Sequence, residues 1–393
     1  MKRSLAVLVA MLVSMPLLAQ QEEGPATAHG KQVNTTGKGY SAAIVIEPST
    51  GQVLFTENAD ESLPTASMAK MMTLLIAMEQ IQHGQLKLDT PVPISARASK
   101  MGGSQIYAKE GQVFPLQTLI AATMIQSAND AAEAIAEKIA GSGEAFADMM
   151  NDKARQLGLK NSSFVDPHGL PNSQDPDRVD KMSAHDLAIL GMQVMQYPLL
   201  MEYAKMPTFP FSNGTFTSGL YNPNHLINPH SRDYFADAIG IKTGYSDPAG
   251  YCVTAAAERG STKLICVVMG ADRPSGPQSS FGIATRLMND AFVHYRMLTG
   301  WHKGQVAGNV PVVKGRAKSV PVVAGADVTA LIKRGEEDDY RMSLAGSANA
   351  PVHQGQQVGW IVVKNKGKEI TRVPALATQD VAHQPWWRAF WPF

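Results

Sequence analysis

Hydrophobic residues recur along the chain with two periods, one typical of strands and one typical of helices. The continuous apolar run over 42–46 (Ala-Ala-Ile-Val-Ile) predicts a buried strand, and a turn leads into a second strand over 52–56. Apolar stretches with helical spacing predict the helices that follow, over 68–80, 116–125, 131–139, 145–157 and 184–195. Strand patterns then return over 238–242, 249–257 and 263–269, before a last amphipathic helix over 281–297.

This order of elements predicts an α+β fold. Strands at both ends of residues 40–298 can share one sheet, with the intervening helices packed on it. Beyond Gly300 the pattern changes to short β-rich runs, over 319–323, 328–332, 340–345, 358–364 and 369–375. The sequence Asn365-Lys366-Gly367 is typical of a hairpin turn between the last two runs. We therefore expect a second, small all-β domain over 299–380.

The first residues have a pattern of their own. Lys2 and Arg3 precede an uncharged apolar run over 5–19, which would rise only about 22 Å as a helix and is too short to span a bilayer. A short buried helix would explain the run. A charged start before a short apolar segment is, however, typical of a secretory signal peptide, here residues 1–19, followed by a flexible lead-in over 20–39. We therefore expect an exported, periplasmic protein.

The last residues are rich in aromatic side chains. No acidic residue occurs from Val381 onward, and this segment contains Trp386, Trp387, Phe390, Trp391 and Phe393. Such a cluster either fills the core of the β-domain or anchors the protein at a membrane surface. We expect 381–393 to be an amphipathic tail that attaches the protein peripherally to the outer face of the inner membrane.

Composition narrows the possible functions. Hydrophobic residues make up 44% of the 393-residue chain and charged residues 18%, which excludes a largely disordered chain. A formal net charge of +1, without a basic run, argues against nucleic acid as a partner. Two cysteines are too few for a disulfide scaffold or a zinc cluster, so no metal or other cofactor is expected. Cys252 and Cys266 fall on neighbouring predicted strands, where they either form a bridge or stay as buried thiols.

The motif Ser67-Met68-Ala69-Lys70 suggests nucleophilic chemistry. Residues three apart share a helix face, so the Lys70 amine approaches the Ser67 hydroxyl. The apolar residues that follow predict burial, which disfavours the ammonium form and makes Lys70 a candidate base. Ser67 would also lie at a helix N-terminus, where free backbone N–H groups stabilise an oxyanion. Taken alone, the motif equally fits a capping serine and a surface lysine.

Two further motifs change that interpretation. Ser127-Ala128-Asn129 lies between two predicted helices, and Lys242-Thr243-Gly244 ends a predicted strand. The order Ser-x-x-Lys, Ser-x-Asn, Lys-Thr-Gly is the signature of the penicillin-recognising serine enzymes. Ser347-Ala348-Asn349 repeats the middle motif within the β-domain, where we predict a turn.

The stretches around these motifs carry a wider resemblance. Residues 63–67 (Leu-Pro-Thr-Ala-Ser), 102–107, 126–131 and 240–245 resemble the penicillin-binding protein 5/6 type D-alanyl-D-alanine carboxypeptidases, and the similarity covers roughly 40–380. The resemblance implies a β-lactamase/transpeptidase-like catalytic domain, a β-rich second domain and an amphipathic C-terminal anchor. It also implies removal of the terminal D-alanine from peptidoglycan stem pentapeptides, with β-lactam antibiotics as covalent inhibitors.

The resemblance implies a role for each matching residue. Ser67 would be the acylated nucleophile and Lys70 its general base. Ser127 would relay a proton to the leaving amine, and Asn129 would hold both Lys70 and the substrate amide. The substrate-binding residues are implied in the same way: Lys242 and Thr243 for the terminal carboxylate, Gly244 for close backbone approach, and the backbone N–H of Tyr245, with that of Ser67, for the oxyanion hole.

Two positions depart from the family pattern. Tyr245 stands where many relatives have histidine, which matters little if only its backbone acts. The arginine that relatives place on the later helix falls near Ser280, and Arg273 or Arg286 would have to replace it.

Three rival functions share this set of motifs. A class A β-lactamase needs a glutamate that activates the deacylating water, and residues 145–201 contain none. A DD-endopeptidase would use the same site on crosslinked peptides. A weakly active penicillin-binding envelope scaffold is supported only by the missing arginine. The sequence does not decide the preference between the two peptidase activities, the oligomeric state or the role of the β-domain.

Overall fold

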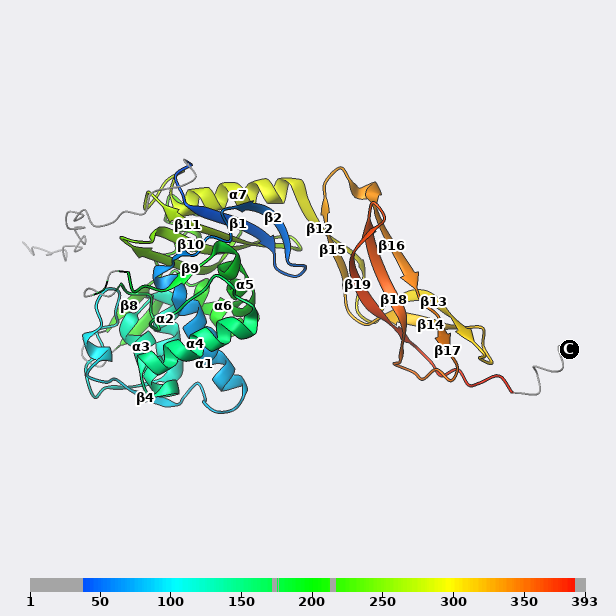
Figure 1. Cartoon of the computed structure of the whole chain (residues 1–393), viewed down its shortest axis with the longest axis horizontal. Coiled ribbons are helices and arrows are strands. Elements are labelled where there is room, and N and C mark those ends of the chain that lie inside the picture. The colour runs from blue at the N-terminus through cyan, green and yellow to red at the C-terminus, as the bar shows by residue number, and fades with distance from the viewer. Residues whose placement is uncertain (1–37, 172–174, 176, 213–216, 386–393) are drawn as a thin grey trace, which may run out of the picture.

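A computed structural model describes residues 38–171, 175, 177–212 and 217–385, which form two lobes (Figure 1). The predicted signal peptide, the lead-in up to residue 37 and the five aromatic residues of the tail lie outside the described residues. Within the described part of the chain, no helix is long and apolar enough to cross a membrane.

The first lobe, residues 38–294, is built on one antiparallel five-stranded sheet in the order β2-β1-β11-β10-β9. Its strands are β1 (Ala42–Glu47), β2 (Gln52–Glu57), β9 (Ala238–Ser246), β10 (Gly250–Arg259) and β11 (Thr262–Ala271). Ile44 of β1 lies opposite Val267 of β11, so the two ends of this lobe meet in the middle of the sheet. The predicted α+β fold is confirmed.

Helices cover both faces of this sheet, and α7 lies on the face opposite to the others (Figure 1). They are α1 (Lys70–Gln82), α2 (Leu116–Ile125), α3 (Asn129–Ala140), α4 (Gly143–Leu157), α5 (Ala184–Val194), α6 (Pro198–Ala204) and α7 (Ser280–His294). Ser183 is the N-cap of α5, since its hydroxyl accepts the Asp186 N–H.

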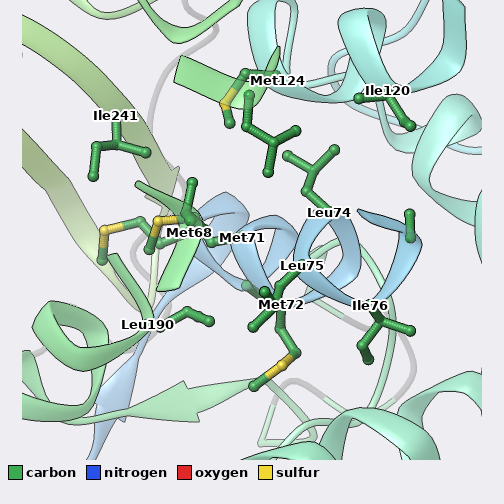
Figure 2. Packing of buried hydrophobic residues seen from close by; sticks show 14 of the residues in the cluster. Met68, Met71, Met72, Leu74, Leu75, Ile76, Ile120, Met124, Leu190 and Ile241 are labelled. Atoms are coloured by element: carbon green, nitrogen blue, oxygen red, sulfur yellow. The ribbon is translucent and has the colours of Figure 1, made fainter. Parts of the chain in front are cut away.

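Helix α1 runs through the interior of the first lobe. Every residue from Lys70 to Met78 is buried, so the helix has no solvent face over this stretch. Figure 2 shows its apolar side chains among Met124 of α2, Leu190 of α5 and Ile241 of β9. A helix enclosed on all sides holds its first turn in a fixed place, and that turn begins at Lys70, with Ser67 in the short 3-10 turn directly before it.

Short elements complete the first lobe. Two-stranded ladders pair β3 (Leu63–Pro64) with β6 (Lys181–Met182), β4 (Pro91–Pro93) with β5 (Val113–Pro115), and β7 (Thr208–Ser212) with β8 (Thr217–Tyr221). The 3-10 turns are η1 (Ala66–Ala69), η2 (Ala98–Lys100) and η3 (His225–Ile227). The hydrophobic pattern does not predict them, because segments this short show no period.

The second lobe, residues 295–385, is all β apart from one 3-10 turn, η4 (Glu337–Asp339). A six-stranded sheet has the order β16-β18-β19-β14-β13-β17, and β12 pairs with β15. The strands are β12 (Tyr295–Trp301), β13 (Val306–Val313), β14 (Ser319–Ala324), β15 (Val328–Lys333), β16 (Tyr340–Ala345), β17 (Ala348–Asn349), β18 (Gln357–Asn365) and β19 (Lys368–Ala377). Its core, which includes Val310, Ile332 and Ile361, is separate from that of the first lobe.

Two local predictions are wrong. The last helix, predicted over 281–297, ends at His294 because Tyr295 pairs with Lys333 and begins β12. The predicted turn at 347–349 contains strand β17, whose Ala348 pairs in parallel with Val312. Both errors come from pairing with residues distant in sequence, which a local pattern does not report.

The question of the two cysteines is settled by strand register. Cys266 of β11 lies opposite Ala255 of β10, not opposite Cys252. Cys252 belongs to the core under α1 and Cys266 to the core under α7, so their side chains leave opposite faces of the sheet. Both are free, buried thiols.

Candidate active site

Ser67 and Lys70 occupy the first turns of the buried helix. Ser67 lies in η1 directly before α1, and the Lys70 Nζ donates a hydrogen bond of 2.8 Å to the Ser67 Oγ. Ala66 adopts a φ of +46°, a left-handed conformation that is unusual for a residue with a Cβ atom. The backbone therefore bends sharply at the residue that presents the serine.

Lys70 is a buried amine whose chemistry is set by its surroundings. Its exposed fraction is 0%, and its Nζ also donates to the main-chain oxygen of His168 at 2.6 Å. Burial lowers its pKa from 10.5 to about 7, although the carboxylates of Asp166, Asp180 and Asp130 act in the opposite direction. A substantial share of the protein at neutral pH therefore holds a neutral Lys70, whose lone pair can accept a proton.

The loop after α4 closes the back of the site. The Asp166 carboxylate accepts the backbone N–H groups of His168 and Gly169 at 2.8 and 2.6 Å, which fixes the carbonyl that contacts Lys70. Gly169 has a φ of +78°, and a Cβ atom there would lie 2.0 Å from the main-chain oxygen of Ala66. The loop at Gly169 thus packs closely against the serine turn.

Ser127 and Lys242 form the second polar pair of the site. Ser127 lies between α2 and α3 with a φ of +60°, and its Oγ accepts a 2.8 Å hydrogen bond from the Lys242 Nζ. Lys242 is 2% exposed and lies on β9. Burial lowers its pKa well below the usual value, and repulsion from Lys70 adds to the effect. Two lysines and two serines, far apart in sequence, therefore meet in one place.

Asn129 differs from its expected contact. Its Nδ2 donates to the main-chain oxygen of Gly102 at 2.7 Å, and no hydrogen bond joins it to Lys70 in the described structure. The Asn129 Oδ1 is buried and, among the described residues, has no hydrogen-bond partner. The expectation that Asn129 holds Lys70 is therefore wrong here, because the amide group reaches the neighbouring loop instead. An unpaired carbonyl oxygen is left to accept an N–H.

A segment not assigned a role from the sequence holds Asn129 in place. The Asp130 carboxylate accepts the backbone N–H groups of Ile106 and Ala108, each at 3.1 Å, and Asp130 is fully buried. The backbone N–H of Asn129 donates to the Ser104 oxygen at 2.7 Å. Residues 102–108 are thereby tied to the Ser-x-Asn motif. The only signal in the sequence is that residues 102–107 and 126–131 are both among the stretches that resemble the family.

Strand β9 forms the open edge of the large sheet and borders the serine turn. A Cβ atom at Gly244 would lie 2.6 Å from the Thr65 oxygen and 3.2 Å from Met68, so only glycine fits this approach. Thr243 and Tyr245 flank Gly244 on the strand. Tyr245 is 53% exposed, and its ring stacks on that of Tyr251 with the ring centroids 4.4 Å apart. The eight residues singled out by the motifs lie on elements that meet around Ser67.

The two candidate arginines have different surroundings. Arg286 is exposed on α7, on the opposite face of the sheet from α1, where its charge acts on Tyr40. Arg273 is exposed on the loop before α7, and this loop forms a bridge between Arg273 and Ser279. Ser280, near which the resemblance would place an arginine, is buried at the start of α7.

Comparison with known proteins gives this arrangement a family. The profile of the D-alanyl-D-alanine carboxypeptidase family matches residues 31–273. The chain belongs to this family. The profile of the penicillin-binding protein 5 C-terminal domain matches residues 295–383, the second lobe of this carboxypeptidase family member.

Individual relatives match either most of the chain or about two thirds of it. D-alanyl-D-alanine carboxypeptidase DacF of Bacillus subtilis is 32% identical over 385 residues, covering 97% of this chain and 95% of its own length. The crystal structure of penicillin binding protein 5 from Haemophilus influenzae superimposes with a TM-score of 0.73 at 25% identity, covering 88% of this chain and 98% of its own. Penicillin-binding protein D2 from Listeria monocytogenes, solved in an ampicillin-bound form, is 27% identical with a TM-score of 0.56, covering 65% of this chain and 98% of its own.

Proposed function

We propose that the protein is a serine D-Ala-D-Ala carboxypeptidase that removes the terminal D-alanine from peptidoglycan stem pentapeptides through an acyl-enzyme on Ser67. The observation that carries this proposal is the 2.8 Å contact between the Ser67 Oγ and a fully buried Lys70 whose pKa is about 7. A serine hydroxyl is a weak nucleophile until a nearby base accepts its proton, and a neutral lysine is such a base.

The first step forms an ester. The Ser67 Oγ attacks the carbonyl carbon of the penultimate D-alanine while its proton passes to the Lys70 Nζ. Backbone N–H groups of Ser67 and Tyr245 are proposed to stabilise the developing oxyanion. When the peptide bond breaks, the leaving amine takes a proton through Ser127, which Lys242 holds at 2.8 Å. Water then hydrolyses the ester and restores the hydroxyl.

The substrate is proposed to bind along the edge strand β9. Its terminal carboxylate is assigned to Lys242 and Thr243, since a buried cation and a hydroxyl are a strong site for an anion. The free Oδ1 of Asn129 is available to accept a substrate amide N–H. A bound carboxylate would also favour the charged form of Lys242, which burial disfavours.

Mass spectrometry after incubation with a penicillin tests the nucleophile. A covalent penicilloyl adduct on Ser67 that persists for minutes is expected, and Ser67→Ala removes it. The matched control is Ser62→Ala, which deletes an exposed hydroxyl that donates to the Asn161 oxygen and leaves the adduct intact. Labelling that survives Ser67→Ala would contradict the proposal.

The choice of substrate separates the carboxypeptidase from its two alternatives. Release of D-alanine from a linear D-Ala-D-Ala peptide is expected. The Lys242→Gln variant is expected to lose most of this activity while it stays folded. Faster cleavage of crosslinked peptides would identify a DD-endopeptidase. Acylation by penicillin without turnover of either peptide would identify a scaffold.

We also propose that the protein is exported by residues 1–19 and attached peripherally to the cytoplasmic membrane by the aromatic tail. Burial of each tail aromatic at the headgroup boundary contributes about 1 to 2 kcal/mol, from about 25 cal/mol per Å² of apolar surface. Deletion of residues 386–393 is expected to release the protein from neutral vesicles without changing cleavage of a small soluble peptide. Joint loss of thermal stability and activity would instead make the tail part of the β-domain.

A further inference from the structure

A cluster of cations marks the end of the second lobe from which the chain continues into the tail. Lys314, Arg316 and Lys318 alternate along the hairpin that joins β13 to β14, and all three are exposed. No acidic residue occurs in the sequence from His302 to Ala326. We call these three residues the basic hairpin. Within the described part of the chain, none of them takes part in an ion pair.

The basic hairpin lies directly beside the start of the tail. The backbone N–H of Gln384 donates to the Lys314 oxygen at 2.7 Å, and the N–H of Arg316 donates to the Ala382 oxygen at 2.9 Å. Gly315 and His383 form a bridge between the two segments. The chain therefore leaves the lobe at Pro385 alongside the three cations, at the end far from the first lobe (Figure 1).

The opposite end of the same sheet provides a contrast. The turn between β18 and β19 also carries three lysines, Lys364, Lys366 and Lys368, in the same alternating arrangement. There, however, Lys366 lies 3.6 Å from Glu336 and 3.4 Å from Asp339, both at the η4 turn. Glu336 and Asp339 follow β15, and the end of β15 pairs with the start of β12, the strand that follows α7. The turn that contains Lys366 therefore lies at the end of the sheet near the first lobe. One of the three lysines of this turn is thus paired with two acids, whereas none of the three cations of the basic hairpin is in an ion pair among the described residues.

We propose that the basic hairpin is a second membrane-contacting element, which binds anionic phospholipid headgroups next to the aromatic tail. The inference rests on the proposed tail attachment, because the tail brings this end of the lobe to the bilayer. Exposed lysine and arginine side chains without acidic partners are attracted to the negative surface of such a membrane within a Debye length. The aromatic residues supply apolar burial and the hairpin supplies charge.

Two contacts also define how the enzyme would stand on the membrane. The hairpin and the tail share one end of an elongated lobe, and the first lobe is at its other end (Figure 1). Joint attachment at both points would restrict tilting of the second lobe more than attachment at one point. The active site would then be held away from the bilayer, on the side of the peptidoglycan.

Vesicle co-sedimentation with the full chain tests the inference. Vesicles of phosphatidylcholine with phosphatidylglycerol are compared with vesicles of phosphatidylcholine alone, for the wild type and the triple variant K314Q/R316Q/K318Q. The matched control is K364Q/K366Q/K368Q, which removes the same charge from the other turn. Each cation contributes roughly fivefold to binding, so the hairpin variant, which lacks three, is expected to lose on the order of a hundredfold on anionic vesicles. The control variant is expected to lose much less.

Further arms separate this inference from the tail proposal. On neutral vesicles the hairpin variant is expected to bind like the wild type, whereas deletion of 386–393 abolishes binding there. The deletion variant is expected to keep weak, salt-sensitive binding to anionic vesicles, and adding the hairpin substitutions removes it. Equal binding of the wild type to both vesicle types, or equal losses in the two triple variants, would overturn the hairpin while leaving the tail. Loss of binding to soluble polyphosphate, with unchanged binding to vesicles, would also overturn the lipid assignment.

Discussion

Lys70, the proposed general base, owes its lowered pKa to burial rather than to sequence spacing. The spacing of Ser67 and Lys70 brings two side chains together, but an exposed lysine at the same spacing would be charged at neutral pH. Enclosure of α1 on every side removes water from the amine, and its pKa falls to about 7. Because water does not reach the buried amine, one of its N–H groups donates instead to the main-chain oxygen of His168.

The pKa of Lys70 predicts a pH dependence. If Lys70 is the base, as proposed, its neutral amine accepts the serine proton, so the rate of acylation should rise as the pH increases through about 7 and then level off. The measurement is the second-order rate constant for a β-lactam without a titrating group in this range. A rate that falls as the pH rises through neutrality would contradict a lysine base.

Replacement of Lys70 tests the same point without a pH change. Arginine keeps the positive charge but does not accept a proton at working pH, so Lys70→Arg should lower the acylation rate by about 10² to 10⁴. Circular dichroism checks that the variant is folded. Near-normal acylation would mean that another group, such as Ser127, receives the proton.

Gly169 is a residue at which a single methyl group should disturb the site. In Gly169→Ala the new Cβ would overlap the Ala66 oxygen at 2.0 Å, which displaces either the serine turn or the carbonyl that holds Lys70. Gly84→Ala is the control, because Gly84 has a similar φ of +73° but open space around it. The control should lose about 1 kcal/mol of stability and keep full acylation. Gly169→Ala should lose more stability and most of its acylation.

At the scale of elements, Asp130 connects a helix to the loop that borders the site. Its buried carboxylate accepts backbone N–H groups from Ile106, Ala108 and Ala131. Desolvation raises its pKa, while these three hydrogen bonds act against the rise. The loop in turn provides the Gly102 oxygen that orients Asn129.

Asp130→Asn should therefore loosen the loop over residues 102–108. The amide keeps one acceptor oxygen and replaces the other by a donor that faces backbone N–H groups, at a cost of about 1 to 3 kcal/mol. Urea unfolding should report that loss, and acylation should weaken because Asn129 loses its orientation. Asp148→Asn, at an exposed position on α4, should change neither measurement. Full acylation in Asp130→Asn would show that the loop does not position Asn129.

The sequence predicts elements better than the contacts between them. Helix α2 has the predicted bounds, because its apolar pattern is strong and its ends are marked by Pro115 and by the polar corner at Ser127. The three motifs allow the candidate site residues to be predicted from the sequence, since each motif is a short local pattern. The contacts of Lys70 with His168 and of Asn129 with Gly102 join distant segments, and local patterns carry no information on them.

At the scale of the molecule, the two lobes have separate hydrophobic cores. The chain passes from α7 directly into β12, and the lobes are also joined by hydrogen bonds such as that from the Met297 N–H to the Thr262 Oγ1. None of the eight candidate site residues lies in the second lobe. We therefore expect the second lobe to affect where the first lobe stands rather than how it reacts.

A chain that ends at His294 should consequently fold and react with penicillin. Its acylation rate should stay within about a factor of two of the full chain, because a domain with its own core folds independently. Stopped-flow acylation and thermal unfolding of both forms give the comparison. A large loss of rate in a well-folded fragment would assign the second lobe a direct part in the reaction.

The two thiols are buried on opposite faces of the sheet, and their burial makes this protein convenient for site-specific labelling. Burial raises the pKa of Cys252 to about 12 and raises that of Cys266 further, so both stay protonated and shielded from alkylating reagents. These are the only cysteines in the chain. A cysteine introduced by Ala317→Cys, at the tip of the β13–β14 turn, would thus be the single reactive thiol on the native surface. An environment-sensitive fluorophore attached there would report the approach of this turn to a bilayer in the intact enzyme, without removal of any native side chain that absorbs or reacts.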